Sequence, residues 1–243
     1  MATLFLTEYS IVLKFIFGYS RFSLIYISVH SRPDFWPMTQ NKLEDKMPVY
    51  AIDDLIPVVD PSAYVHPTAV LIGDVIIGAN CYVGPNAALR GDFGRVILEQ
   101  GCNVQDTCVI HSFPEQDCVI EQDGHIGHGA VLHGCRVGRN ALIGMNAVVM
   151  DKAVIGSESL VAATAFVKGG FECPPRSLVV GSPAKVNRSL SDKEIDWKTK
   201  GTHEYQVLTQ RCLQSMREVQ ALGTVQVDRP RFSASSHRPK DEA

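Results

Sequence analysis

Four of the eight histidines of this 243-residue chain lie between residues 111 and 133: His111, His125, His128 and His133. Neutral imidazole is the commonest protein ligand for zinc and similar metals, so this cluster indicates metal binding. Three histidines that leave a fourth coordination position open are typical of a catalytic site, because the metal lowers the pKa of its bound water to about 7. The residues therefore predict hydroxide chemistry at neutral pH, with a purely structural interface metal as the alternative.

An apolar residue that recurs every six positions sets the frame for these histidines. The recurrence predicts an all-β fold, a left-handed parallel β-helix of hexapeptide repeats with about 18 residues in each coil. A small residue lies four places after each member of the later series, and glycine often follows the aliphatic position, where it would relieve a positive φ. A β-sandwich would show a period of two instead. The two long series are Val65, Leu71, Ile77, Val83 and Leu89, and Val131, Val137, Ile143, Val149, Ile155, Val161 and Val167; a shorter run, Ile97, Asn103 and Val109, lies between them.

The repeat gives the clustered histidines different places. His111 and His133 each lie two positions after an apolar repeat residue, so they share a phase. Their separation of 22 positions is one coil plus a four-residue irregularity at 113–117, which places them on one face at about 4.8 Å. His128 lies around a corner, so we expect it to come from a neighbouring subunit, and a homotrimer would hold three equivalent sites. His125 is expected to have a structural role.

The sequence pattern divides the chain into four segments. Residues 1–46 are interpreted as an over-called start or a disordered extension, with a targeting or membrane-associated segment as the alternative, and residues 47–188 as the β-helix. Residues 189–223 are predicted to form C-terminal α-helices, because Ser191 and Glu194 have the spacing of a capping box and apolar residues then recur at three- and four-residue steps. Residues 224–243 are predicted to be a flexible tail. The recurring apolar residues are Tyr205, Leu208, Cys212, Met216 and Val219.

The composition excludes several classes of partner and site. A hydrophobic content of 45% is ordinary for a soluble globular protein. The net charge of −3 argues against nucleic acid and anionic membranes, which bind basic surfaces. Seven cysteines without a C-x-x-C pair indicate a reducing compartment, hence a cytoplasmic protein, and argue against cysteine as a metal ligand.

Several short motifs resemble those of the γ-class carbonic anhydrases over about residues 48–190. The resemblance implies a homotrimer in which His111, His128 and His133 bind a divalent metal across the subunit interface. The metal would be zinc in the first place, with iron and cobalt as alternatives. The motifs are Arg90-Gly91-Asp92, Asn103-Val104-Gln105-Asp106, His111, Gly127-His128 and His133-Gly134-Cys135.

The same resemblance implies catalytic roles for four polar residues. Arg90, Asp92 and Asp106 would pair across the interface, where such partners orient the metal ligands. Gln105 would hydrogen-bond near the metal-bound water.

A narrower resemblance, from Met47 to about residue 222, is to the hexapeptide proteins of phenylacetate degradation and, more loosely, to those of the carnitine operon. It is carried by stretches that include 113–117, 180–185 and 201–208. It implies a cytoplasmic, homotrimeric thioesterase that hydrolyses ring-derived acyl-CoA thioesters with a metal-bound hydroxide. The alternatives are a γ-class carbonic anhydrase that hydrates CO2 and a non-catalytic accessory trimer.

Phe93 bears on the choice between these activities. It follows Arg90-Gly91-Asp92 at the position where the carbonic anhydrases carry an acidic residue, so rapid proton export is in doubt, and Glu115 is the only nearby substitute. Thioester hydrolysis depends less on proton transfer, because a thiolate whose thiol has a pKa of about 8.5 leaves with little protonation. Phe93 would also add an apolar surface for an aromatic acyl group.

Overall fold

The computed structural model describes residues 4–7, 10–13 and 48–232. The chain divides into two compact units, Met1–Glu44 and Asp45–Ala243. In the first unit, β1 (Leu4–Thr7) and β2 (Ser10–Leu13) form an antiparallel pair. The interpretation of residues 1–46 as an over-called start or a disordered extension otherwise falls outside the described residues, and so does the end of the predicted tail, residues 233–243.

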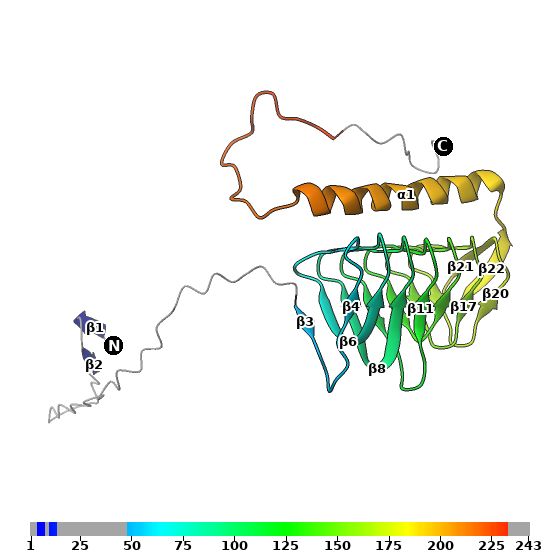
Figure 1. Ribbon diagram of the computed structural model, residues 1–243, viewed down its shortest axis with the longest axis horizontal. Helices are drawn as coiled ribbons and strands as arrows, with labels where there is room; N and C mark the ends of the chain where they lie inside the picture. Colours follow the sequence, from blue (N-terminus) through cyan, green and yellow to red (C-terminus); the bar gives the residue numbers. More distant parts are fainter. Residues whose placement is uncertain (1–3, 8–9, 14–47, 233–243) are drawn as a thin grey trace, which may run out of the picture. The chain divides into compact units, whose positions relative to one another are not determined.

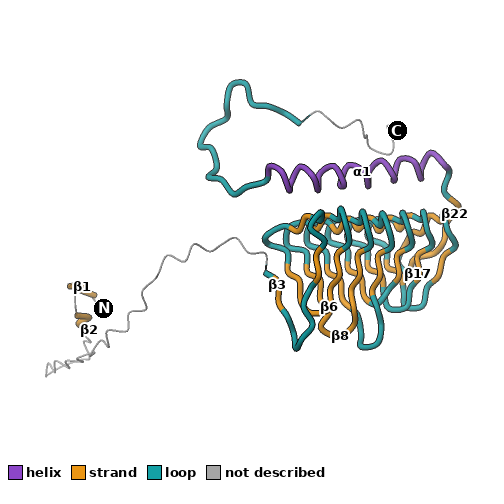
Figure 2. The backbone as a smooth tube through the Cα atoms, viewed as in Figure 1, coloured by secondary structure: helices purple, strands orange, loops and turns teal. Residues whose placement is uncertain are grey.

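The second unit is a prism of short parallel strands, in which each strand pairs with a strand about one coil further along the chain. Figure 1 shows the coils stacked from β3 at one end of the prism to β22 at the other. Figure 2 shows that turns and loops separate the strands of each coil. The predicted parallel β-helix of hexapeptide repeats is confirmed.

The strands form three faces. The histidine face contains β3 (Val49–Tyr50), β10 (Val109–His111), β13 (Val131–His133), β16 (Val148–Val149) and β19 (Phe166–Val167). The third face contains β4 (Val58–Val59), β11 (Cys118–Ile120), β14 (Arg136–Val137), β17 (Val154–Ile155) and β20 (Glu172–Cys173). Two longer strands, β6 (Val70–Ile77) and β8 (Ala88–Leu98), pair with strands of both faces. The helix face contains β5 (Tyr64–Val65), β7 (Tyr82–Val83), β9 (Asn103–Val104), β12 (His125–Ile126), β15 (Leu142–Ile143), β18 (Leu160–Val161), β21 (Ser177–Gly181) and, antiparallel to β21, β22 (Ala184–Ser189).

The core is a column of aliphatic side chains that point into the prism and are no more than 1% exposed. A small residue commonly lies two positions before the inward one, as Ala141 lies before Ile143, and is buried with it. Close packing therefore explains the small residues of the repeat. The inward residues are Leu71, Ile77, Val83, Leu89, Leu98, Val104, Ile110, Ile120, Ile126, Leu132, Val137, Ile143, Val149, Ile155, Val161 and Val167.

In the middle of the chain, the side chains that point into the prism are not the predicted ones. The repeat pattern places Val109 and Val131 inward, but these side chains are 40% and 37% exposed, and Ile110 and Leu132 are inward instead. These strands carry consecutive apolar residues, so hydrophobicity alone does not select the inward one. Because both strands are displaced by the same single position, the histidines that follow them still share a phase.

Glycine after the inward residue serves close stacking of the coils. A Cβ on Gly144 would lie 2.4 Å from the backbone nitrogen of Ala163 in the next coil. The positive φ of the turns occurs instead at residues such as Asn80 and Asn140, with φ of 54° and 53°. Asparagine tolerates this region better than most residues. The expectation that these glycines relieve a positive φ is therefore wrong.

One helix, α1 (Asp192–Ser215), follows β22 and lies along the prism, where it packs against β5, β7 and β9 (Figure 1). Ser191 and Glu194 form the predicted capping box. The prediction of several helices up to residue 223 is wrong, because α1 continues through Gly201 and ends before the exposed Val219. A glycine inside a helix costs about 1 kcal/mol, which the packing of α1 on the prism offsets. In the described ranges, no helix combines the length and apolar character needed to cross a membrane.

A buried lysine joins α1 to the prism. The Lys198 ammonium donates hydrogen bonds to the carbonyl oxygen of Asp123 (2.7 Å) and to Oδ1 of Asn140 (2.6 Å). Burial lowers the pKa of Lys198 to about 7, and the nearby charge of Asp123 opposes this only in part. One of the contacts that attach α1 to the prism therefore buries a cationic group, which is costly in free energy.

The observed assignment of inward residues predicts that two neighbouring substitutions lower the stability of the protein by unequal amounts. Leu98 is inward and Ile97 is only partly buried. We expect Leu98→Ala to lower the free energy of unfolding by about 2–5 kcal/mol and Ile97→Ala by about 1 kcal/mol. Urea denaturation followed by circular dichroism measures both values, and a larger loss in Ile97→Ala would contradict this assignment.

Lys198 predicts a stability that rises with pH. Because its pKa is about 7 in the folded state and 10.5 in the reference state, the unfolded chain binds more protons than the folded chain between these values. Stability should therefore increase from about pH 7 to pH 10, with a slope of up to about 1.4 kcal/mol per pH unit from this group. Urea denaturation of the wild type and of Lys198→Met isolates the contribution. A stability difference between the two proteins that does not change with pH would refute the assignment.

Candidate metal centre

His111 and His133 lie side by side on the histidine face. They end β10 and β13, whose parallel register places them directly opposite each other, as the repeat predicted. Nδ1 of His111 lies 3.1 Å from Nε2 of His133. Two nitrogen ligands at 2.0–2.1 Å from a tetrahedral metal are about 3.3 Å apart, so the pair has the spacing of two ligands on one ion.

Each of these rings is held by a carboxylate through its other nitrogen. Asp92 Oδ1 lies 2.8 Å from Nε2 of His111, and Asp151 Oδ1 lies 2.6 Å from Nδ1 of His133. Carboxylates in this position orient imidazole ligands and make them more basic. Asp151 is absent from the predicted site, although it follows His133 by 18 positions, the length of one coil, and that spacing was a usable signal.

Arg90 completes this arrangement on the side of His111. Its Nε donates to Oδ2 of Asp92 at 3.0 Å. Burial acts to raise the pKa of Asp92, but hydrogen bonds from His111 and Arg90, together with the charge of Arg90, lower it below the usual value. Asp92 is therefore held as a carboxylate. The structure brings Arg90 and Asp92 together with the histidine pair within one chain, and their pairing across an interface stays a prediction.

His128 lies in the turn between β12 and β13, at the corner of the histidine face and the helix face. Its Nδ1 lies 2.9 Å from Oδ2 of Asp106, and both side chains are about half exposed. The proton of this hydrogen bond lies on Nδ1, which leaves Nε2 with its lone pair. Among the described residues of one chain, no three His, Cys, Asp or Glu side chains are grouped so that they could hold a metal ion. A three-histidine site would therefore need His128 from another chain.

Gln105 is buried behind His128. Its Nε2 donates to Oδ1 of Asn103 (3.0 Å) and contacts Nε2 of His125 (2.7 Å), while its Oε1 accepts from the backbone nitrogen of His128 (3.3 Å). Both amide hydrogens are thus used inside the chain, and the predicted contact of Gln105 with metal-bound water stays a prediction. His125 lies under α1, where its Nδ1 is 3.3 Å from the hydroxyl of Thr202.

Two phenylalanines flank the histidine pair. The Phe93 ring centroid lies 5.5 Å from that of His111, and the Phe113 centroid lies 4.8 Å from that of His133. The rings are 62% and 55% exposed. A Cβ on Gly94 would lie 2.3 Å from the carbonyl oxygen of Phe113, so the two aromatic segments are packed backbone to backbone. Phe93 was predicted to add an apolar surface here, whereas the place of Phe113 is known only from the structure.

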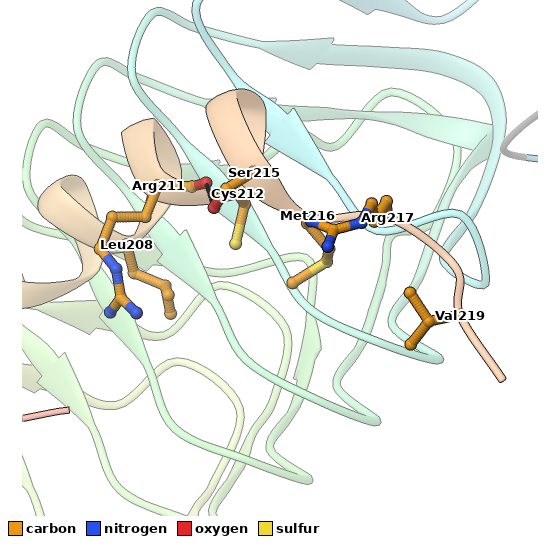
Figure 3. Close-up of a pocket in the computed structure, with 7 residues that line it drawn as sticks. All are labelled: Leu208, Arg211, Cys212, Ser215, Met216, Arg217 and Val219. Carbon is orange, nitrogen blue, oxygen red and sulfur yellow. Dashed lines mark hydrogen bonds between the residues drawn. The ribbon is translucent and has the colours of Figure 1, made fainter. Parts of the chain in front are cut away.

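Two hollows of the described chain lie elsewhere. One, of about 330 Å³, lies at the C-terminal end of α1, and Figure 3 shows the side chains that line it. Another, of about 320 Å³, lies beside the first half of α1. Neither contains a predicted metal ligand. The first is lined by Leu208, Arg211, Cys212, Ser215, Met216, Arg217 and Val219, and the second by Asp123, Asn140, Thr199, Lys200, Thr202, His203 and Gln206.

Comparison with known proteins matches residues 57–91 and 134–169 to the family described as bacterial transferase hexapeptide (six repeats). The carnitine operon protein CaiE of Proteus sp. (strain LE138) is 52% identical over 197 residues, which cover 81% of this chain and 100% of that protein. CaiE of Escherichia coli (strain K12) is 53% identical over 190 residues, 78% of this chain and 97% of that protein. A crystal structure of a hexapeptide transferase family protein from Anaplasma phagocytophilum has a TM-score of 0.65 and 34% identity, and it covers 68% of this chain and 98% of that one.

These matches correct the narrower resemblance drawn from the sequence. The identification with PaaY, the phenylacetate-degradation protein, is wrong, because relatives that match over their whole length at about half identity are carnitine operon proteins. Two of the stretches that suggested it have structural positions: 180–185 includes the turn between β21 and β22, and 201–208 lies within α1. Such stretches reflect the fold and do not identify a substrate.

Removing the charge of Asp151 tests the orientation of His133. In Asp151→Asn the amide oxygen can still accept from Nδ1 of His133, but the ring becomes less basic. We expect the affinity for Co²⁺ to fall about 10- to 100-fold in an absorption titration. The matched control is Asp196→Asn, which removes an exposed carboxylate from α1 and should leave the affinity unchanged. Wild-type affinity in Asp151→Asn would show that this carboxylate does not orient a ligand.

Proposed function

Since the chain belongs to the CaiE family of hexapeptide-repeat proteins, we propose that it is a metal-dependent hydrolase of acyl-CoA thioesters that serves carnitine metabolism, with its sites at the interfaces of a homotrimer. The link to carnitine rests on the name of the relatives. A cytoplasmic location is supported by the seven cysteines, all of which are free thiols.

One observation supports the metal-centre part of the proposal: one ring nitrogen of each of the three predicted ligands lies within hydrogen-bond distance of an aspartate oxygen. Asp92 holds His111, Asp106 holds His128 and Asp151 holds His133. This pattern of carboxylate, histidine and metal is the usual surrounding of catalytic imidazole ligands. The 3.1 Å between the facing nitrogens of His111 and His133 fits a shared divalent ion.

The trimer is supported by the surface beside the histidine pair. Val109, Val131, Val148 and Phe166 are paired in register along the histidine face and point outward. Three of them are more than a third exposed in the single chain. A continuous apolar column of this kind is typical of the core of a subunit interface. A threefold arrangement would cover it and bring His128 of one subunit to the pair of the next.

The residues around the pair suit an acyl transfer to water. A bound divalent metal supplies Lewis acidity there, which makes a coordinated water more acidic and polarises a carbonyl oxygen. The guanidinium of Arg90 lies 3.4 Å from Nε2 of His111 and can attract the negative charge that develops on the substrate. Phe93 and Phe113 form an apolar border against which an acyl chain can lie.

Thioester hydrolysis fits this border better than CO2 hydration. Water adds to the carbonyl carbon and the C–S bond breaks. The thiolate leaves without prior protonation, because its thiol has a pKa of about 8.5; it then takes up one proton of the water, and the carboxylic acid releases the other. CO2 hydration also releases one proton, and the much faster turnover of a carbonic anhydrase would require rapid export of it. Position 93 carries no acid for that purpose, which leaves Glu115, in the loop after β10, as the candidate for it.

Mixing two inactive variants tests the shared site. His128→Ala and the double variant His111→Ala/His133→Ala should each fail to hydrolyse acyl-CoA thioesters. When the two are unfolded and refolded together, about one quarter of the interfaces should combine an intact pair with an intact His128, by random assembly. We therefore expect recovery of about one quarter of the wild-type rate, measured by thiol release from a panel of acyl-CoA thioesters with Zn²⁺ or Co²⁺ present.

The other outcomes separate the alternatives. Activity retained by His128→Ala would rule out the three-histidine mechanism, and activity that the mixture does not recover would place all ligands in one chain. Wild-type protein that hydrates CO2 but releases no thiol would be a carbonic anhydrase. If neither substrate is turned over, the non-catalytic accessory trimer becomes the function to pursue.

A further inference from the structure

A buried polar network lies between α1 and the corner that carries His128. Asn103 and His125 are neighbours in register on the helix face, with Tyr82 before them and Leu142 after them. Asn103, Gln105 and Thr202 are at most 3% exposed. The amide nitrogen of Asn103 is buried without a hydrogen-bond partner among the described residues. A network that leaves a buried donor unsatisfied is costly for stability, so its retention calls for another explanation.

The bonds of the network run in one consistent direction. Gln105 Nε2 contacts Nε2 of His125 at 2.7 Å and can only donate, so His125 Nε2 is the acceptor. The proton of the His125 ring is then on Nδ1, which donates to the hydroxyl of Thr202 at 3.3 Å. At the other end, Oε1 of Gln105 accepts from the backbone nitrogen of His128 at 3.3 Å. A continuous path therefore leads from α1 to the backbone of the third histidine.

The turn that carries His128 has little freedom apart from this path. The carbonyl oxygen of His128 accepts from the backbone nitrogen of Asn146 at 2.9 Å. A Cβ on Gly127 would lie 2.9 Å from the backbone nitrogen of Met145, so the turn lies directly against the next coil. On the amide side, the Gly127 nitrogen donates to the carbonyl oxygen of Ile143 at 2.8 Å, and Gln105 is the acceptor for the amide of His128 itself. A small displacement there would move the His128 ring relative to its partners.

We infer that His125 is a positioning residue for the metal centre. Its Nε2 fixes the side chain of Gln105, and Gln105 in turn fixes the backbone of His128. The packing of α1 against His125 therefore contributes to the geometry of the site. This inference rests on the proposed function, because it assigns His125 a task only if His128 binds a metal. The simpler reading is that the network only attaches α1 to the prism. The Lys198 network attaches the same helix through Asp123 and Asn140 and offers a matched comparison.

Three variants of the full-length chain test the inference by Co²⁺ titration, which reports both affinity and the visible absorption of the bound ion. His125→Leu places an apolar side chain of similar size against Tyr205 and removes the acceptor for Gln105. We expect its Co²⁺ affinity to fall at least about tenfold, with a changed spectrum, as for other partners that orient ligands. His125→Gln can offer an amide oxygen to Gln105 and should restore both affinity and spectrum. Lys198→Met changes the seating of α1 elsewhere and should bind Co²⁺ like the wild type.

The outcomes are distinguishable from failure of the proposed function. If the wild type binds no Co²⁺, the metal centre itself is refuted, and the role of His125 falls with it. If the wild type binds Co²⁺ and His125→Leu binds it equally well, only the positioning role is refuted. Equal losses in His125→Leu and Lys198→Met, with matching decreases in Tm, would assign the network to helix attachment alone and would also overturn the inference.

Discussion

Every feature of the candidate site depends on the parallel stacking of successive coils. The hydrogen bonds between coils fix neighbouring strands at about 4.8 Å and hold their residues in register. Residues that are one coil apart in sequence therefore become neighbours in space, as His133 and Asp151 do. The same constraint allows no side chain where the backbones of two coils approach closely, which explains Gly144 and Gly94. The pair of histidines on this scaffold therefore takes its spacing from the backbone.

The irregular segments of the solenoid supply what the regular coils cannot. A coil of uniform hexapeptides presents only one outward residue per strand and repeats it at every level. The long strand β8 carries Arg90, Asp92 and Phe93 to the histidine face, and the loop after β10 carries Phe113 there. The charge and the apolar border of the site both come from these interruptions. The part of the fold that breaks the repeat is thus the part that places irregular side chains beside the histidine pair.

The helix face and the histidine face of the prism differ in what covers them. The helix face is covered by α1 and buries an aromatic cluster together with the polar network behind His128. The histidine face leaves an apolar column exposed beside two of the three histidines. His128 lies at the corner between them, next to the polar network and about half exposed. Membership in the CaiE family agrees with such a scaffold, and the chemistry that it carries is set by these side chains.

The period of six and the shared phase of His111 and His133 were determined by the sequence alone, because both depend only on counting along the chain. The capping box of α1 was likewise readable, since it depends on residues only three positions apart. The inward choice between Val109 and Ile110 and the single helix through Gly201 were decided by the tertiary structure. The first depends on packing inside the prism, which selects between residues of equal hydrophobicity, and the second on the packing of α1 against the prism, which overrides local propensity. The substrate could not be read from motifs, because the stretches that resembled other hexapeptide proteins serve the fold that they share.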